Sequence, residues 1–482
     1  MKTLQKLQLT GMLLIFCSVI ISCAKEKYVA KPLDAQKVST GILNKDLSNP
    51  NFKAYLAKQG FAQSNLPILE WDLDALTYAA LYFNPKLDIA KAQLALADTA
   101  IKTANQQPNP SLNGNIARSN QANGDIRPWS YGLNVEIPIE TSNKRQIRVE
   151  EASHLRDAAQ TAVAEVAWQL RSQIAKDLLA YHENMALQQA ASRELGVHNS
   201  IINMLEKRLQ LGLIDNTTLS DAKLLQQKTR ITANALPARL IEIKAALASD
   251  IGLSVEKLNG ITIKPLVVDT VLNQESDLLK TSQQFKELQQ NALLNRLDIR
   301  RSLAKYAAAE AKIKLEIAKQ TPDIAFTPGF IFDFGDKIWS LGLTSLLNLL
   351  NKNQTLIAEA MQLREIEAAQ FEALQTSIIG DLSLAYARYQ SALQHINAIQ
   401  SQLNLQNKQQ QNLQKQFDAG LIDRLIVTQY SLHYLLAEQE LLNLKFDCLK
   451  TAIAIEDLMQ KPLFGEQILS KVVPDQLNKQ PL

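Results

Sequence analysis

The sequence repeats its own pattern once, at a separation of about 210 residues. Four short segments recur in the same order, each displaced by between 208 and 212 positions. The matched pairs are Leu87-Asp88-Ile89 with Leu297-Asp298-Ile299, Pro110-Ser111-Leu112 with Pro322-Asp323-Ile324, Trp129-Ser130-Tyr131-Gly132-Leu133 with Trp339-Ser340-Leu341-Gly342-Leu343, and Gly212-Leu213-Ile214-Asp215 with Gly420-Leu421-Ile422-Asp423. Four matches in one order indicate a tandem duplication, so the fold must contain two similar halves.

Hydrophobic residues at helical spacing dominate each half. A long helix is predicted over 144–211 with a return helix over 217–250, and the second half repeats this pair over 354–417 and 424–460. At 1.5 Å per residue the longer helices reach on the order of 100 Å, which no globular core can cover. The low content of 16 Gly and 15 Pro in 482 residues is typical of long helices with few turns. We therefore expect the helices to pack on one another as a coiled-coil bundle.

Each half also contains two segments in which apolar and polar residues alternate, as in a β-strand. These segments are 111–119, 129–139, 322–334 and 338–348, close to the length of about nine to eleven residues that a bilayer-crossing strand needs. Four strands do not close into a barrel, and lipid does not tolerate an open sheet edge, so several chains must pool their strands if the sheet spans a membrane. The apolar face would then contact lipid through Trp129, Tyr131, Leu133, Val135, Phe326, Phe330, Phe332 and Phe334.

The patterns divide the chain into six parts, and each repeat begins with a further helix, predicted over 71–107 and 291–319. The parts are a signal peptide over 1–22, an extended N-terminal segment over 23–70, the first repeat over 71–252, a linker over 253–284, the second repeat over 285–461 and a tail over 462–482.

The N-terminus has the pattern of a bacterial lipoprotein signal. The apolar stretch Met12–Ile21 follows two lysines and is too short to span a bilayer. It leads into Ile20-Ile21-Ser22-Cys23, which resembles a lipobox and implies cleavage before Cys23 with lipid attached to that residue. Ala24 follows in place of the aspartate that retains lipoproteins at the inner membrane, so the outer membrane is the expected location. The alternative is an ordinary signal peptide in which the cysteine is incidental.

Several functional classes lack their sequence signatures here. The net charge is +3, with no basic stripe interleaved with aromatic residues, which argues against nucleic-acid binding. No Gly-rich phosphate loop, Gly-x-Ser-x-Gly elbow or HExxH motif is present. The five histidines lack metal-ligand spacing, and Cys448 lies in a helical pattern as a core residue. We therefore predict no enzyme activity, no cofactor and no metal site.

The order of these elements resembles the TolC family of outer-membrane efflux proteins over essentially the whole mature chain. The strand-to-helix segments 140–145 and 346–354, with 357–360, are similar to the CzcC-like subgroup, which serves heavy-metal cation export. The resemblance implies a mainly α fold with a small β part, in which a homotrimer forms a twelve-stranded barrel and a periplasmic helical tunnel. It also implies an exit duct in a tripartite efflux system. The expected partners are outer-membrane lipid, a periplasmic membrane-fusion adaptor and an inner-membrane RND-type pump.

The two Gly-Leu-Ile-Asp turns are the candidate docking sites for the adaptor, because apolar residues flank a polar tip. The simpler interpretation is helix reversal alone, since glycine relieves the left-handed turn conformation. The family often has acidic residues where Ile426 and Gln429 stand, while the first repeat keeps Asp221, so an acidic ring is not expected at the second turn. The candidate residues are Arg208, Gly212, Leu213, Ile214, Asp215, Gly420, Leu421, Ile422, Asp423 and Arg424.

Two alternatives to a metal-efflux duct remain at this stage. Within the same fold, the chain would be a duct for multidrug efflux or type I protein secretion, and the sequence distinguishes these ducts poorly from a metal-efflux duct. In another class, it would be a structural lipoprotein whose coiled coil merely spans the periplasm. The alternating aromatic strands argue against the second alternative, because a scaffold does not need them. The missing motifs make a third alternative, a soluble enzyme with a helical cap, remote.

Overall fold

A computed structural model describes residues 27–61, 68–120, 127–272, 282–345 and 351–462, so the signal region and Cys23 lie outside the described residues. The chain divides into two compact units, 1–44 and 45–482. In the first unit, helix α2 (Ala35–Leu43) begins after Asp34, whose carboxylate accepts hydrogen bonds from the amides of Gln36 and Lys37. The extended conformation predicted for the N-terminal segment is therefore wrong here, because this cap supports a helical turn.

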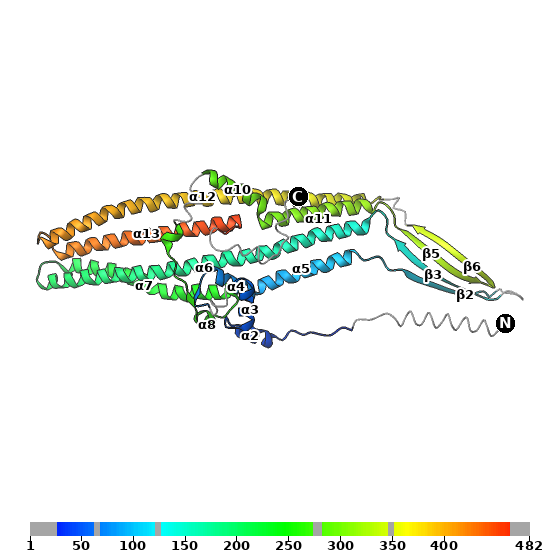
Figure 1. The fold of residues 1–482 in the computed structure, drawn as a ribbon, viewed down its shortest axis with the longest axis horizontal. Coiled ribbons are helices and arrows are strands. Elements are labelled where there is room, and N and C mark those ends of the chain that lie inside the picture. Colours follow the sequence, from blue (N-terminus) through cyan, green and yellow to red (C-terminus); the bar gives the residue numbers. More distant parts are fainter. Residues whose placement is uncertain (1–26, 62–67, 121–126, 273–281, 346–350, 463–482) are drawn as a thin grey trace. The chain divides into compact units, whose positions relative to one another are not determined.

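The second unit is built on two helical hairpins (Figure 1). Helix α6 (Lys144–Gln210) pairs with α7 (Asn216–Ile251), and α12 (Gln354–Asp418) pairs with α13 (Arg424–Met459). Helix α6 also packs against α13, which joins the two repeats. Along α12 the buried residues follow the predicted coiled-coil spacing: Ile378, Leu382, Ala385, Tyr389, Ile396 and Leu403. The predicted mainly helical fold with long hairpins is confirmed.

The predicted strands form one antiparallel sheet at the end of the unit opposite the hairpin turns (Figure 1). Its order is β2 (Ser111–Arg118), β3 (Trp129–Ile139), β5 (Ile324–Asp333) and β6 (Asp336–Ser345). In the central pairing Tyr131 lies opposite Phe332 and Leu133 opposite Phe330, and Phe330 in turn lies opposite Trp339. Because residues opposite one another in an antiparallel pair point to the same face, this register places the aromatic residues and most of the large aliphatic residues of the four strands on one face, whereas Ile331 and Ile338 point to the other.

Phe334 is an exception to the predicted face. The alternation places it with Phe326, Phe330 and Phe332, but β5 ends at Asp333. Phe334 has φ 46° and forms the tight turn with Gly335, whose φ is 132°. A left-handed residue in the turn no longer follows the strand alternation, so the assignment of Phe334 to the strand is wrong.

The helix predicted over 71–107 is two helices, α4 (Leu73–Phe83) and α5 (Pro85–Ala104). Pro85 forces the preceding Asn84 into an extended conformation, with ψ 123°. The Asn84 side chain then accepts a hydrogen bond from the Lys86 amide at 2.9 Å and donates one to the carbonyl of Asp250 at 2.7 Å. The break therefore serves to cap the C-terminal end of α7.

The second repeat has the same break without a proline. Here α10 (Ser282–Asn295) and α11 (Leu297–Ala318) meet at Arg296, which has ψ 144°. The Arg296 guanidinium pairs with Asp298 at 2.5 Å and donates to the carbonyl of Leu458 near the end of α13. Arg296 thus stands in the place of Asn84, and the predicted single helix over 291–319 is corrected to two.

Short elements occupy regions that the sequence pattern left irregular. Helix α3 (Pro50–Lys58) buries Phe52 and Leu56, and α8 (Val255–Leu258) lies in the predicted linker. The two-residue strands β1 (Glu70–Trp71) and β4 (Thr262–Ile263) pair in parallel. A strand of two residues shows no alternation, so this contact between the start of the first repeat and the linker is invisible in the sequence.

Candidate functional site

The first hairpin turn is fixed by backbone hydrogen bonds and one cap. Gly212 has φ 67°, which allows its amide to donate to the carbonyl of Leu209 at 2.9 Å and the Leu213 amide to donate to the carbonyl of Arg208 at 2.9 Å. Asp215 begins α7 by accepting a hydrogen bond from the Thr218 amide at 2.8 Å. Hydrogen bonding to Thr218 lowers the pKa of Asp215, so the cap remains ionised at neutral pH.

The second turn repeats this geometry. Gly420 has φ 71°, the Leu421 amide donates to the carbonyl of Gln416 at 2.9 Å, and Asp423 accepts from the Leu425 amide at 2.6 Å to begin α13. The two turns therefore share one backbone conformation, as their common Gly-Leu-Ile-Asp sequence predicts.

The apolar residues of the turns differ in exposure. Leu213 is 68 % exposed and Leu421 is 75 % exposed, whereas Ile214 and Ile422 are half-buried. Ile214 packs against a small core that contains Leu205 of α6, Leu219 of α7 and Leu425 of α13. The structure thus presents the two leucines at the tip, while Ile214 helps hold the hairpins together.

An ion pair connects the two hairpins at this end. The guanidinium of Arg208, at the end of α6, pairs with the carboxylate of Asp423, the cap of α13. Arg424 instead lies over the ring of Phe417 in its own hairpin, 6.0 Å from the ring centroid. Sequence reasoning placed Arg208 and Asp423 at the tips but not together, because their pairing depends on the packing of one repeat against the other.

Replacing Gly420 with Ala is expected to lower the free energy of unfolding by about 1 kcal/mol, because the left-handed conformation penalises a Cβ atom. No atom lies within 4 Å of the added Cβ, so the cost is backbone strain alone. The matched control is Gly380→Ala within α12, where a Cβ also meets open space but φ is helical, and we expect stabilisation of about 0.5 to 1 kcal/mol. Thermal unfolding of the purified variants compares the two, and changes of the same sign would contradict the explanation.

The sheet presents a wide apolar face. Trp339, Leu341 and Leu343 on β6 are 81 %, 69 % and 75 % exposed, and Trp129 and Tyr131 on β3 are 48 % and 40 % exposed. Leu133, Val135, Phe326 and Phe330 are half-buried. Phe332 is covered by the ring of Tyr131, at 4.8 Å between centroids. So large an exposed apolar surface marks a site of contact with another apolar phase or with another chain.

The opposite face of the sheet carries mostly polar or small residues, with Ile331 and Ile338 as the exceptions. It carries Asn113 and Asn115 on β2, Asn134 and Glu136 on β3, and Thr327 on β5. Gly132 also lies on this face, opposite Asn115, and has no room for a side chain, because a Cβ atom there would come within 2.2 Å of the Asn115 side-chain oxygen. Among the described residues, strands β2 and β6 each pair on one side only and leave their other edges open.

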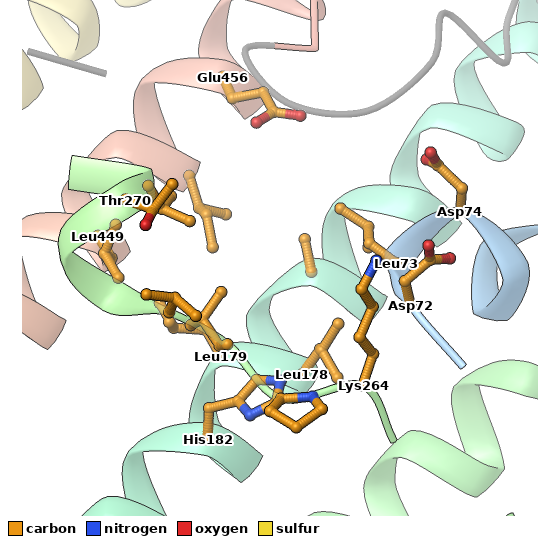
Figure 2. A pocket seen from close by; sticks show the side chains of 16 residues that line it. Asp72, Leu73, Asp74, Leu178, Leu179, His182, Lys264, Thr270, Leu449 and Glu456 are labelled. Carbon is orange, nitrogen blue, oxygen red and sulfur yellow. The ribbon is translucent and has the colours of Figure 1, made fainter. Parts of the chain in front are cut away.

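A mostly apolar cavity of about 480 Å³ lies between α4, α6, α13 and the segment after β4 (Figure 2). His182 and Lys264 lie on one side of it and Glu456 on the other. Burial lowers the pKa of His182 to about 4, so the ring is neutral, and Glu456 is paired with the buried Arg171. Within the described ranges, no group of three or more His, Cys, Asp or Glu side chains is arranged to hold a metal ion.

Asp177 of α6 faces Asp250 of α7 at the base of the first hairpin. Burial, followed by the hydrogen bond and charge of Asp250, raises the pKa of Asp177 from 3.8 to about 7, while Gln173 and Lys176 lower it. The folded chain therefore holds an extra proton between about pH 4 and pH 7, and the free energy of unfolding falls as the pH rises through this window.

Raising the pH from 5 to 8 is expected to destabilise the protein by on the order of 1 kcal/mol through this half-exposed pair. Asp177→Asn should remove that part of the pH dependence, whereas Asp221→Asn on the exposed face of α7 should leave it. Thermal unfolding at the two pH values measures the difference. An unchanged pH dependence in Asp177→Asn would show that the carboxyl pair is ionised throughout.

No helix in the described part of the chain is at once long and apolar enough to cross a bilayer.

Comparison with known proteins agrees with this architecture. The family model described as outer membrane efflux protein matches residues 76–253 and 288–459, which together are well over half of the chain. No curated protein matches the sequence.

Solved structures are similar along nearly their whole lengths. VceC from Vibrio cholerae is 18 % identical, with 81 % of this chain and 97 % of that chain covered at a TM-score of 0.63. CusC is 17 % identical, with 91 % and 100 % covered at a TM-score of 0.64. CmeC from Campylobacter jejuni, an outer membrane channel, is 12 % identical, with 91 % and 93 % covered at a TM-score of 0.60. These likenesses establish the fold, and the family model covers both repeats. The chain therefore belongs to the outer membrane efflux protein family, and it is a channel protein of the outer membrane that extends into the periplasm, not an enzyme.

Proposed function

We propose that the chain is the passive exit duct of a tripartite efflux system. In this proposal three copies combine their sheets into a twelve-stranded barrel in the outer membrane, and their helices form a tunnel through the periplasm. An inner-membrane RND-type pump supplies the energy, and a membrane-fusion adaptor connects the pump to the helical hairpins. The lipid anchor at Cys23 holds the N-terminus at the same membrane.

The observation that carries the proposal is the division of the sheet into two unlike faces. The exposed apolar face, with Trp129 and Trp339, suits lipid, and the face with Asn113, Asn134 and Thr327 suits a water-filled interior. The open edges of β2 and β6 need partners, since an unpaired edge in lipid costs several kcal/mol for each unsatisfied backbone group. Pairing β6 of one copy with β2 of the next closes the sheet with no edge left.

The hairpin tips suit adaptor docking. Leu213 and Leu421 stand exposed on turns of the same conformation, so a trimer offers six similar leucine tips around one axis. Asp215, Asp423 and Arg424 surround them with charge. For the cargo, the CzcC-like segments favour divalent heavy-metal cations.

The test is single-channel conductance of the purified protein in a planar bilayer, with chemical cross-linking of the same sample to count subunits. We expect a trimer with a small conductance that increases when the residues beside Gly212 or Gly420 are changed. A monomer without conductance would contradict the barrel, and a structural coiled-coil lipoprotein would then be the better explanation.

A further inference from the structure

A second cavity lies where the strands of the first repeat meet the helices. It has a volume of about 410 Å³ and is lined by the end of β3, by residues 142–146 at the start of α6, and by Gln107 and Pro108. This volume lies within the range of about 300 to 1,000 Å³ that is usual for small-molecule sites. This cavity lies at the junction of the apolar sheet and the helical bundle, whereas the cavity in Figure 2 lies among the helices.

The charged groups around this cavity do not cancel. Glu140 is neutralised by Arg148, whose guanidinium lies 2.5 and 3.1 Å from its two carboxylate oxygens. Lys144 is buried and bonded to Asp323 at 2.7 Å and to the carbonyl of Thr321 at 2.6 Å. Arg145 also lines the cavity, is half-buried, and takes part in no ion pair with any described residue. Among the described residues, the positive charge of Arg145 therefore has no carboxylate partner.

The cavity also opens beside the apolar face of the sheet. Ile137 and Ile139 line it and are 41 % and 51 % exposed. Ile137 lies opposite Phe326 in the sheet register, on the same face as the exposed aromatic residues. An unpaired guanidinium next to exposed aliphatic side chains is complementary to a molecule with an anionic head and an apolar tail.

We propose that this cavity binds a phospholipid of the periplasmic leaflet, with Arg145 contacting the phosphate and an acyl chain lying along Ile137 and Ile139. The guanidinium offers parallel donors that match two phosphate oxygens, and basic pockets at membrane boundaries bind lipid headgroups in this way. The inference rests on the proposed function, because it requires the sheet to lie in the membrane and the start of α6 to lie at its periplasmic surface. Inorganic phosphate shares the headgroup chemistry but cannot use the isoleucines.

The test is titration of the full-length protein in detergent with dioleoyl phosphatidylglycerol, followed by native mass spectrometry. We expect Arg145→Ala to weaken binding at this site five- to tenfold and Arg145→Lys to restore much of it. Arg230→Ala, on an exposed part of α7 far from the sheet, should change it less than twofold. Equal binding by the Arg145→Ala and Arg230→Ala variants would overturn the proposal.

Two further probes separate the sources of the phosphate. Dioleoylglycerol has the same acyl chains without the phosphate, so it should bind to the unsubstituted protein no better than to the Arg145→Ala variant. Millimolar inorganic phosphate should not displace the phospholipid. Displacement by phosphate would make this an anion site instead of a lipid site.

Conductance measured on the same preparations distinguishes this inference from the channel proposal. An intact trimeric pore whose lipid binding does not depend on Arg145 contradicts only the lipid site. A chain without pore or trimer contradicts the proposed function, and the lipid site with it.

Discussion

Joining position 208 to position 423 by a short covalent tether is expected to abolish conductance through the assembled channel. Arg208 and Asp423 form the ion pair between the two hairpins, and their side chains are 32 % and 47 % exposed. So exposed an ion pair contributes about 0 to 1 kcal/mol, which is easily lost when the tunnel opens. If opening separates the two hairpins at the tip, as a shift between two packings of the bundle, a covalent bond must block it.

The experiment uses the double variant Arg208→Cys with Asp423→Cys and a thiol cross-linker that a reductant cleaves. Conductance is measured before and after cleavage, so each channel serves as its own reference. Cys448 is fully buried and competes poorly for the reagent. The matched control is Glu206→Cys with Lys223→Cys, because this ion pair of 2.8 Å joins α6 to α7 within one hairpin. We expect the control tether to leave conductance unchanged. Normal conductance through a channel with a complete 208–423 tether would exclude separation of the hairpins as the opening step.

Glu456→Ala is expected to lower the free energy of unfolding by about 3 to 5 kcal/mol, because it leaves the Arg171 guanidinium buried without its countercharge. The two side chains are 4 % and 3 % exposed, and they join α13 of the second repeat to α6 of the first. Trp168 beside them donates to Asp457 at 3.1 Å, and Lys176 pairs with the same carboxylate at 2.8 Å. The site is therefore a buried polar connection between α6 and α13.

The double variant Arg171→Met with Glu456→Leu should recover most of the lost stability, since an apolar pair of similar volume removes the need for countercharge. Lys314→Met is the control, because Lys314 pairs with Glu150 between α11 and α6 at 2.8 Å but is 55 % exposed, so its loss should change the stability far less than the loss of Glu456. Thermal and denaturant unfolding of the variants gives the comparison. A loss in Glu456→Ala no larger than in Lys314→Met would show that water reaches the buried pair.

Local patterns in the sequence were sufficient to predict the repeated elements. Alternation from Trp129 to Ile139 predicted the strand, and the strict period of two also predicted which residues share its apolar face. The glycines at 212 and 420 predicted the helix reversals, because a helix interior has a negative φ and the turn after it needs a positive φ, which glycine adopts without strain. Pro85 is a sufficient local signal for the break between α4 and α5, because a proline forces the residue before it out of the helical conformation.

Features that depend on contacts between distant segments were not predictable from one sequence. The break at Arg296 has no local signal, since its guanidinium is held by Asp298 and by the carbonyl of Leu458. The contact of Arg208 with Asp423 and the burial of Ile214 likewise follow from how the hairpins pack. The resemblance to a known family predicted the class of protein but none of these contacts.

The open edges of β2 and β6 have a consequence for how the protein is made. Within the described residues, a single chain released into the periplasm has two unpaired strand edges next to an exposed apolar face with Trp129, Trp339 and Leu343. Such a surface is prone to aggregation, because any extended strand can pair with it. In the proposed trimer, biogenesis must therefore shield the lone sheet until two further copies arrive, so we expect membrane insertion and assembly to be coupled steps. At low synthesis rates, degradation of waiting monomers competes with assembly, so the yield of channels should rise more steeply than the amount of chain produced.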